Sequence, residues 1–400
     1  MPSVRLENDD SNAGGSHWIS LLSMMKFLAT GIVLTMTLRA ELQPALPPAA
    51  RMSAARLETA SRLLAAEISS GRVLAASLLV ARHEKVVLHR GYGKLAPTGE
   101  ARPVTPGTVF LLASITKPVT ACSLLLLAER GKVSLNDPAR VYLPELAHQD
   151  IRVRDLLSHT SGMPDMLPEN TELRRAHAPL SEFVKHAMTT PLLYPPRTDF
   201  RYQSMGTLLA GEIVERVSGK RLRDFEREEI FAPLGMKDSS LGLGGRRIED
   251  TAWCQSQPGP DTDRFGANSP YWRDMGHPWG GMHSTTMDLA ILLQTFLDGG
   301  VYAGKRVFSR ATVAAMTRDQ NTAIGKPWGL GWGLATSIVW SYFGELVSPR
   351  TFGHSGATGT VAWADPETGL VCVILTTRPS GEDDGRLLRL VSNAVAGAVE

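Results

Sequence analysis

The sequence of 400 residues predicts an α+β fold, in which an antiparallel sheet is flanked by N- and C-terminal helices and a mainly helical subdomain is inserted. Strand patterns occur near both ends of the domain, helical patterns precede the first strands and follow the last, and prolines with short helical patterns dominate residues 131–290. With 43% hydrophobic and 20% charged residues, residues 51–400 are expected to form one large globular domain.

An apolar run at residues 18–38 precedes this domain, followed by a proline- and alanine-rich segment at 43–50. A start at Met25 would give a lysine, an apolar stretch and then small residues, which is the outline of a secretory signal. The full run also approaches the roughly 20 apolar residues of a membrane-spanning helix. We therefore expect residues 1–50 to be a signal peptide or membrane anchor plus a linker, with cleavage favoured. The domain would then be periplasmic or extracellular in a bacterium.

The domain begins with a helix and a pair of strands. Apolar residues with helical spacing over 53–68 predict a helix that stops near Gly71. Apolar segments at 75–81 and 86–88, separated by polar residues, predict two strands joined by a turn. The strongly apolar segment 114–131 then predicts a buried helix that ends in a left-handed glycine.

Later elements complete both parts of the fold. A helical pattern at 208–217 belongs to the expected helical subdomain, and a Thr-x-x-Asp cap opens a further helix at 285–297. Apolar segments at 359–364 and 370–376, separated by turn residues, predict a hairpin. A last helix at 386–399 is expected to cover the sheet.

Ser114 and Lys117 are the first candidates for chemistry. Their spacing on a helix places hydroxyl and amine one above the other on the same face. A serine hydroxyl needs an adjacent base, and a lysine can act as one only if burial or a positive field lowers its pKa. The start of a buried helix supplies both conditions. The same pattern recurs at Ser23 and Lys26 in the apolar N-terminal run, so the spacing alone does not identify a site.

A resemblance to a known family rests on six sequence motifs in a fixed order. The motifs are Ser114-Ile115-Thr116-Lys117, residues 131–138, residues 154–162, Tyr202-Gln203-Ser204, residues 233–236, and Gly353-His354-Ser355-Gly356. With these motifs the chain resembles the serine β-lactamase and penicillin-binding protein superfamily, in the class C-like branch that also holds DD-peptidases, D-aminopeptidases and esterases. The similarity covers nearly everything after residue 53 and implies a β-lactamase/transpeptidase-like fold.

The resemblance also implies roles for individual residues. Ser114 would be the nucleophile that becomes acylated, and Lys117 its base or proton relay. Tyr202 would help to deprotonate the serine and protonate the leaving group, for which a cation such as Lys117 would have to lower the pKa of the phenol. The backbone amides of Ser114 and Ala357 would form the oxyanion hole. The alternative for Tyr202 is an interface tyrosine packed between subdomains.

Two positions depart from the family pattern, and both bear on substrate binding. His354 precedes Ser355 and Gly356 at a predicted strand beside the cleft, where β-lactamases usually have lysine. A histidine is largely neutral at pH 7, so it would bind an anionic β-lactam weakly, or serve only as a structural hydrogen-bond partner. Ser204 replaces a common asparagine and could lose a contact with a substrate amide. Arg378 is either a substitute anchor for a carboxylate or a solvated side chain.

Composition argues against several other kinds of function. The net charge is +2 with both signs interspersed, so nucleic acid is not an expected partner. Cys122, Cys254 and Cys372 are far apart and odd in number, which indicates neither a disulfide framework nor a zinc site. His277 and His283 lack the spacing and carboxylates of a metal site, so neither metal nor cofactor is expected. The oligomeric state stays open.

We therefore expect a serine hydrolase that acts through an acyl-enzyme on the ester, peptide or amide carbonyl of a small-molecule or peptide substrate. Esterase or peptidase activity is favoured over efficient β-lactamase activity. The alternatives are a true β-lactamase and a non-catalytic penicillin-binding or cell-wall scaffold protein. An α/β-hydrolase elbow at 353–357 is not expected, because its last glycine is absent and the strand-turn-helix context is missing.

Overall fold

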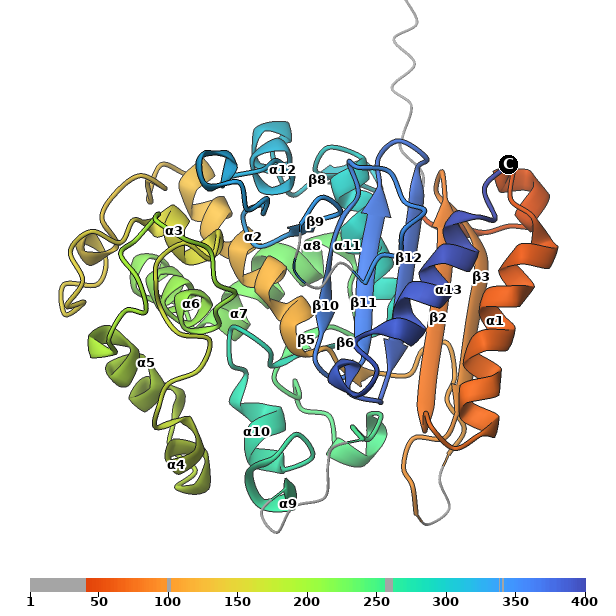
Figure 1. Ribbon diagram of the computed structural model, residues 1–400, viewed down its shortest axis with the longest axis horizontal. Coiled ribbons are helices and arrows are strands. Elements are labelled where there is room, and N and C mark those ends of the chain that lie inside the picture. Colours follow the sequence, from red (N-terminus) through yellow and green to blue (C-terminus); the bar gives the residue numbers. More distant parts are fainter. Residues whose placement is uncertain (1–40, 99–101, 256–261, 338, 340–341) are drawn as a thin grey trace, which may run out of the picture. The chain divides into compact units, whose positions relative to one another are not determined.

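The computed structural model describes residues 41–98, 102–255, 262–337, 339 and 342–400 (Figure 1). The run at 18–38, in which we expected a signal peptide or anchor, lies outside the described residues. Within the described ranges, none of the helices combines the length and apolar character that a membrane crossing requires.

Residues 43–50, which we expected to form a linker, are packed against the domain. β1 (Gln43–Pro44) pairs in parallel with β3 (Lys85–Gly93) at the edge of the main sheet, a position that tolerates proline. The guanidinium of Arg82 donates a hydrogen bond to the carbonyl of Ala50 at 3.0 Å. This segment therefore belongs to the fold and is not a free linker.

The main sheet has seven strands and is antiparallel except for the β1–β3 pair. Its order is β1, β3, β2 (Ala75–Arg82), β12 (Leu370–Thr376), β11 (Thr360–Asp365), β10 (Phe352–Gly356) and β9 (Gly333–Leu334). The predicted hairpin is confirmed, because β11 pairs over its whole length with residues 370–375 of β12. β2 and β12 are apolar without alternation because both of their faces are covered.

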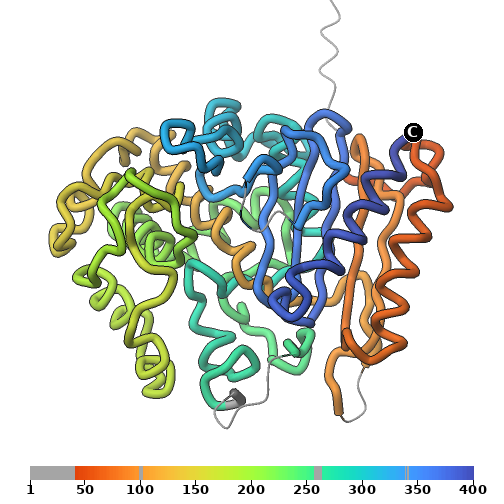
Figure 2. The backbone as a smooth tube through the Cα atoms, in the orientation of Figure 1, coloured from red at the N-terminus to blue at the C-terminus, as the bar shows by residue number. Residues whose placement is uncertain are grey.

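Helices from the two ends of the domain cover one face of the sheet. α1 (Ala54–Ser69) and α13 (Arg386–Ala396) lie side by side on this face (Figures 1 and 2). Neighbouring residues of β2 point to opposite faces: Leu78 packs in the core under these two helices, and Leu79 packs in the core on the other face. α11 (Thr286–Leu297) covers that other face. The predicted α+β class and the flanking helices are therefore confirmed.

Short helices gather on the side of α2 (Thr116–Glu129) away from the sheet (Figure 1). They are α3 (Val153–Leu157), α4 (Asn170–Arg175), α5 (Leu180–Thr189), α6 (Met205–Ser218), α7 (Leu222–Glu226), α9 (Thr262–Phe265) and α10 (Pro270–Met275). The short α8 (Ala232–Leu234) is seen between α2 and α11 in Figure 1. α2 contacts α6 and α7, and the 3-10 turn that precedes α2 contacts β10. The N-terminal end of α2 therefore lies where the helices meet the sheet.

A second, three-stranded sheet leads the chain into α2. Its order is β4 (Phe110–Leu111), β6 (Met282–Ser284) and β5 (Ser240–Leu241). A hairpin of β7 (Val301–Tyr302) and β8 (Lys305–Arg306) is followed by α12 (Arg310–Thr317). Sequence patterns missed these strands because a segment of two or three residues shows no periodicity.

Candidate active site

The backbone before α2 is held in an unusual conformation that presents Ser114. Ala113 has a φ of 50°, which is sparsely populated for a residue with a side chain. Residues Ala113–Ile115 form a 3-10 turn, so Ser114 precedes the α-helix that begins at Thr116. The Thr116 hydroxyl donates to the Ala113 carbonyl at 2.7 Å and accepts from the Met282 N–H at 3.0 Å. These bonds tie the turn to β6, and Ser114 is left partly exposed.

Lys117 lies behind Ser114 in the protein interior. Its Nζ is 3.0 Å from Ser114 Oγ and donates to the carbonyl of Trp279, also at 3.0 Å. The residue is 2% exposed, and burial lowers the pKa of the amine from 10.5 to about 7, although the charge of Asp165 opposes this shift. A large fraction of Lys117 is therefore neutral at physiological pH and can accept a proton from the Ser114 hydroxyl.

Tyr202 approaches the same two groups from the helical side of the cleft. Lys117 Nζ lies 4.7 Å from the centre of the Tyr202 ring. Burial raises the pKa of the phenol well above 10, and a hydrogen bond with Ser114 only partly offsets that rise. The condition for Tyr202 to act as a base, a pKa lowered by a neighbouring cation, is therefore not met, because desolvation outweighs the other effects. The phenol is protonated at neutral pH, which suits a donor or relay of protons.

β10 brings the last of the six sequence motifs, Gly353-His354-Ser355-Gly356, to the opposite side of Ser114. Gly356 passes so close to the segment before Ser114 that a Cβ on Gly356 would lie 2.1 Å from the Leu112 carbonyl oxygen. A glycine is therefore required here. Ser355, Gly356 and Ala357 line the cleft, and Ala357 follows the last residue of β10.

His354 does not line the cleft, in contrast to the direct substrate contact that we expected. The ring is 2% exposed, and Nδ1 lies 2.7 Å from the Ser355 carbonyl oxygen. Burial lowers the pKa of His354 to about 3, so the ring is neutral. The structure thus agrees with the prediction that this position carries no positive charge, and it buries the side chain, which is not among the residues that line the cleft.

The cleft above Ser114 has a volume of about 430 Å³. Of the residues singled out in the sequence, those that line it are Ser114, Tyr202, Ser204, His277, Ser355, Gly356 and Ala357. Four aromatic rings form much of its wall, namely Tyr202, Trp272, Trp279 and Tyr342. Two larger hollows, of about 720 and 640 Å³, are lined by other residues and contain none of these groups.

Two charged residues of the cleft were missed in the sequence. Asp165, in the loop after α3, accepts a hydrogen bond from the Ser204 hydroxyl at 2.6 Å. Arg174, on α4, lies 3.7 Å over the Trp272 ring, and its Nε and Nη2 donate to the Phe265 carbonyl at 3.2 and 2.8 Å. The only sequence signal for Asp165 was its position as an acidic residue soon after the motif at 154–162. No sequence signal pointed to Arg174.

Aromatic and histidine rings support Tyr202 from behind. The His159 ring centre lies 4.6 Å from that of Tyr202 and 5.0 Å from that of Trp328. The backbone N–H of Gln203 donates to His159 Nδ1 at 3.2 Å, and burial holds the pKa of His159 well below its usual value. This neutral ring belongs to the motif at 154–162, so part of that motif fixes the position of Tyr202.

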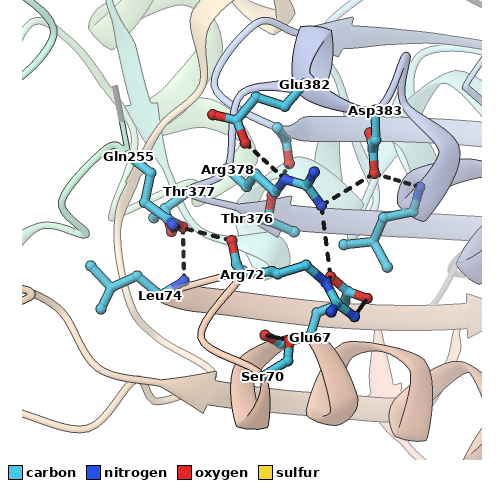
Figure 3. Close-up of polar contacts among 12 residues, drawn as sticks. Glu67, Ser70, Arg72, Leu74, Gln255, Thr376, Thr377, Arg378, Glu382 and Asp383 are labelled. Atoms are coloured by element: carbon cyan, nitrogen blue, oxygen red, sulfur yellow. Dashed lines mark hydrogen bonds and ion pairs between the residues drawn. The ribbon is translucent and has the colours of Figure 1, made fainter. Parts of the chain in front are cut away.

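Arg378 is neither a carboxylate anchor nor a solvated side chain. Figure 3 shows its guanidinium between the carboxylates of Glu382, Asp383 and Glu67, at 2.9, 3.5 and 3.7 Å. The side chain is 17% exposed and does not line the cleft above Ser114. Arg378 thus links the segment after β12 to α1. Among the described residues, no group of three or more His, Cys, Asp or Glu side chains is placed to hold a metal ion.

Comparison with known proteins agrees with this geometry. The family model named Beta-lactamase matches residues 57–396. A protein of Salmonella gallinarum named "Putative D-alanyl-D-alanine carboxypeptidase" is 30% identical over 340 residues, which cover 76% of this chain and 78% of that relative. A protein of the same name from Escherichia coli K12 is 28% identical over 376 residues, which cover 83% and 85% of the two chains.

Solved structures share the fold. EstCE1, described as a hydrolase with promiscuous acyltransferase activity, superposes with a TM-score of 0.70 at 21% identity, covering 86% of this chain and 98% of its own. A family VIII carboxylesterase gives a TM-score of 0.69 at 24% identity with the same coverage. At these identities the likeness establishes the fold alone. The family match extends over most of the domain, and the chain belongs to the beta-lactamase family and is a serine hydrolase.

Proposed function

We propose that this protein hydrolyses ester or amide carbonyls through an acyl-enzyme on Ser114. One observation carries the proposal: a buried Lys117 whose pKa is lowered to about 7 lies 3.0 Å from the Ser114 hydroxyl. Lys117 is the base, since a neutral amine at this distance can take the hydroxyl proton as Oγ bonds to the carbonyl carbon. The oxyanion then forms opposite the backbone N–H groups of Ser114 and Ala357.

Collapse of this intermediate breaks the bond to the leaving group, which takes a proton from the Tyr202 phenol. The phenol recovers a proton from Lys117, whose Nζ lies 4.7 Å from the ring centre. Water then attacks the acyl carbon and gives up a proton along the same route, so that the acid is released and the Ser114 hydroxyl is restored. Protons and bonds balance over the cycle without an added cofactor.

The site favours an ester, a small amide or a peptide as substrate over a β-lactam. A β-lactam carries a carboxylate, and the neutral His354 offers it no charge where family β-lactamases usually have lysine. Ser204 directs its hydroxyl to Asp165 at 2.6 Å, so this hydroxyl donates to a carboxylate of the protein and not to a substrate amide. The first departure reduces the affinity for an anionic substrate, and the second removes a hydrogen-bond donor to a substrate amide.

A fluorophosphonate probe and two chromogenic substrates test the proposal. The probe should label the protein, and Ser114→Ala should abolish both labelling and hydrolysis of p-nitrophenyl butyrate. Labelling that persists in Ser114→Ala would refute the assignment. Efficient turnover of a chromogenic cephalosporin without ester cleavage would favour a β-lactamase, and stoichiometric acylation without release would favour a non-catalytic penicillin-binding protein.

We also propose that the protein is exported. The support is the apolar run at 18–38 followed by small residues and prolines. Expression of the full chain in a bacterium, followed by cell fractionation and N-terminal sequencing, tests this. Cleavage before the domain with release from the cytoplasm is expected, whereas an intact N-terminus in the membrane fraction would indicate an anchor and an intact cytoplasmic protein would refute export.

A further inference from the structure

The carboxylate of Asp165 lines the same cleft as the proposed nucleophile. The Ser204 hydroxyl donates to Asp165 Oδ1 at 2.6 Å, and the Ser204 backbone N–H donates to the Asp165 carbonyl at 3.2 Å. These two bonds fix the loop to the start of α6 and hold the carboxylate in place. Lys117 is within electrostatic reach of Asp165, but a large fraction of this buried amine is neutral at physiological pH. The charge of Asp165 therefore remains available to a group that enters the cleft.

This charge acts at the reacting end of the cleft. The negative field of Asp165 raises the pKa of both Lys117 and Tyr202, which places the carboxylate within electrostatic reach of both groups. The Gly353-His354-Ser355-Gly356 motif on β10 provides no compensating cation, because His354 is neutral. The rings of Tyr202 and Trp279 also line the cleft, and the faces of aromatic rings attract cations.

Arg174 is the other charged residue of the lining, and it is held in the wall. Its guanidinium stacks on Trp272 at 3.7 Å, and two of its N–H groups donate to the Phe265 carbonyl. Its charge lowers the pKa of His277, beside Trp272. Asp165, by contrast, acts on Lys117 and Tyr202, the groups that contact Ser114.

We propose that the site selects substrates with a primary ammonium group beside the scissile carbonyl, such as esters and amides of amino acids, and that Asp165 binds the ammonium. The proposal rests on the function proposed above and names the substrate class of that site. A carboxylate and an ammonium that meet in a partly buried cleft attract each other more strongly than they do in water. The same carboxylate repels substrates whose acyl part is anionic.

Competition against a neutral reporter ester tests this inference. The assay measures inhibition of p-nitrophenyl butyrate hydrolysis by alaninamide, which is a cation, and by N-acetylalaninamide, which is neutral and otherwise similar. Both compounds are tested as the L and the D enantiomer. We expect the cation to inhibit about tenfold more tightly. Asp165→Asn keeps an acceptor for Ser204 and should bring the ratio of the two inhibition constants close to one, while Asp165→Glu should retain a preference for the cation.

The ratio separates this inference from the proposed function. If Asp165→Asn also changes Lys117, hydrolysis of the reporter ester changes equally in both inhibition measurements. This effect therefore cancels in the ratio of the two inhibition constants. If Asp165→Asn does not fold, the wild-type ratio should still decrease as salt screens the charge pair. Equal inhibition of the wild type by the two compounds would overturn the inference. So would tighter inhibition by N-acetylalanine, which is an anion, if the Arg174→Gln substitution abolished that inhibition. Absence of both reporter hydrolysis and Ser114 labelling would instead overturn the proposed function.

Discussion

Replacing Lys117 by methionine should stabilise the fold while it abolishes activity. Burial lowers the pKa of Lys117 from 10.5 to about 7, so between these two values the unfolded chain binds the proton and the folded protein does not. Stability therefore rises with pH across this window. The penalty for burying the amine is about 5 kcal/mol at the acidic limit and about 2 kcal/mol at pH 9. Methionine has a similar length and carries no such penalty.

Urea unfolding of the wild type and Lys117→Met between pH 6 and pH 9 measures this effect. The advantage of the variant should shrink by roughly 3 kcal/mol as the pH rises. Lys132→Met is the matched control, because Lys132 is exposed just beyond the same helix and should give no such pH-dependent difference. An advantage of Lys117→Met that stays constant over this range would show that the lysine keeps an ordinary pKa, and would refute our reasoning on its role as a base.

Four further outcomes are expected. The kcat/KM for p-nitrophenyl butyrate should rise with pH through about 7 as Lys117 loses its proton, and a flat profile from pH 5 to 9 would contradict this. Gly356→Ala should lower kcat/KM by about 100-fold or more, because the new methyl would collide with the Leu112 carbonyl and displace β10; unchanged ester hydrolysis would argue against this close approach. Glu226 is fully buried with a pKa raised to about 8, so its cost to stability grows as the pH rises above 4.5; Glu226→Gln should therefore raise the Tm more at pH 8 than at pH 5, and the reverse order would refute the assignment. Arg378→Met should lower the Tm and leave kcat/KM within about twofold, whereas a selective loss of activity would return Arg378 to the substrate site.

Patterns of local origin could be predicted from the sequence. The first helix was expected at 53–68 and is observed at Ala54–Ser69, and the left-handed glycine at Gly131 follows the end of α2 as expected. The Thr285 side chain caps α11 by accepting from the Asp288 N–H at 3.2 Å. In each case neighbouring residues determine the structure through helical periodicity or capping.

Features that depend on distant segments could not be predicted. Asp165 is bonded in the cleft to the Ser204 hydroxyl, 39 residues later. A base role for Tyr202 would have needed a lowered pKa, but a sequence does not reveal how fully a phenol is buried, and burial raises this pKa. His354 was assigned to the right strand, but its side chain is buried and does not line the cleft, because a motif of four residues does not show which side chains of a strand meet the substrate.

Mass spectrometry of a trapped acyl-enzyme tests the central claim most directly. Wild-type protein quenched in acid during ester turnover should carry the mass of the acyl group, and peptide mapping should locate it on Ser114. Lys117→Met, in which the serine remains but its proposed base is lost, should carry none. An acyl group on another residue, or undiminished acylation without Lys117, would contradict the claim that these two side chains form the nucleophile and its base.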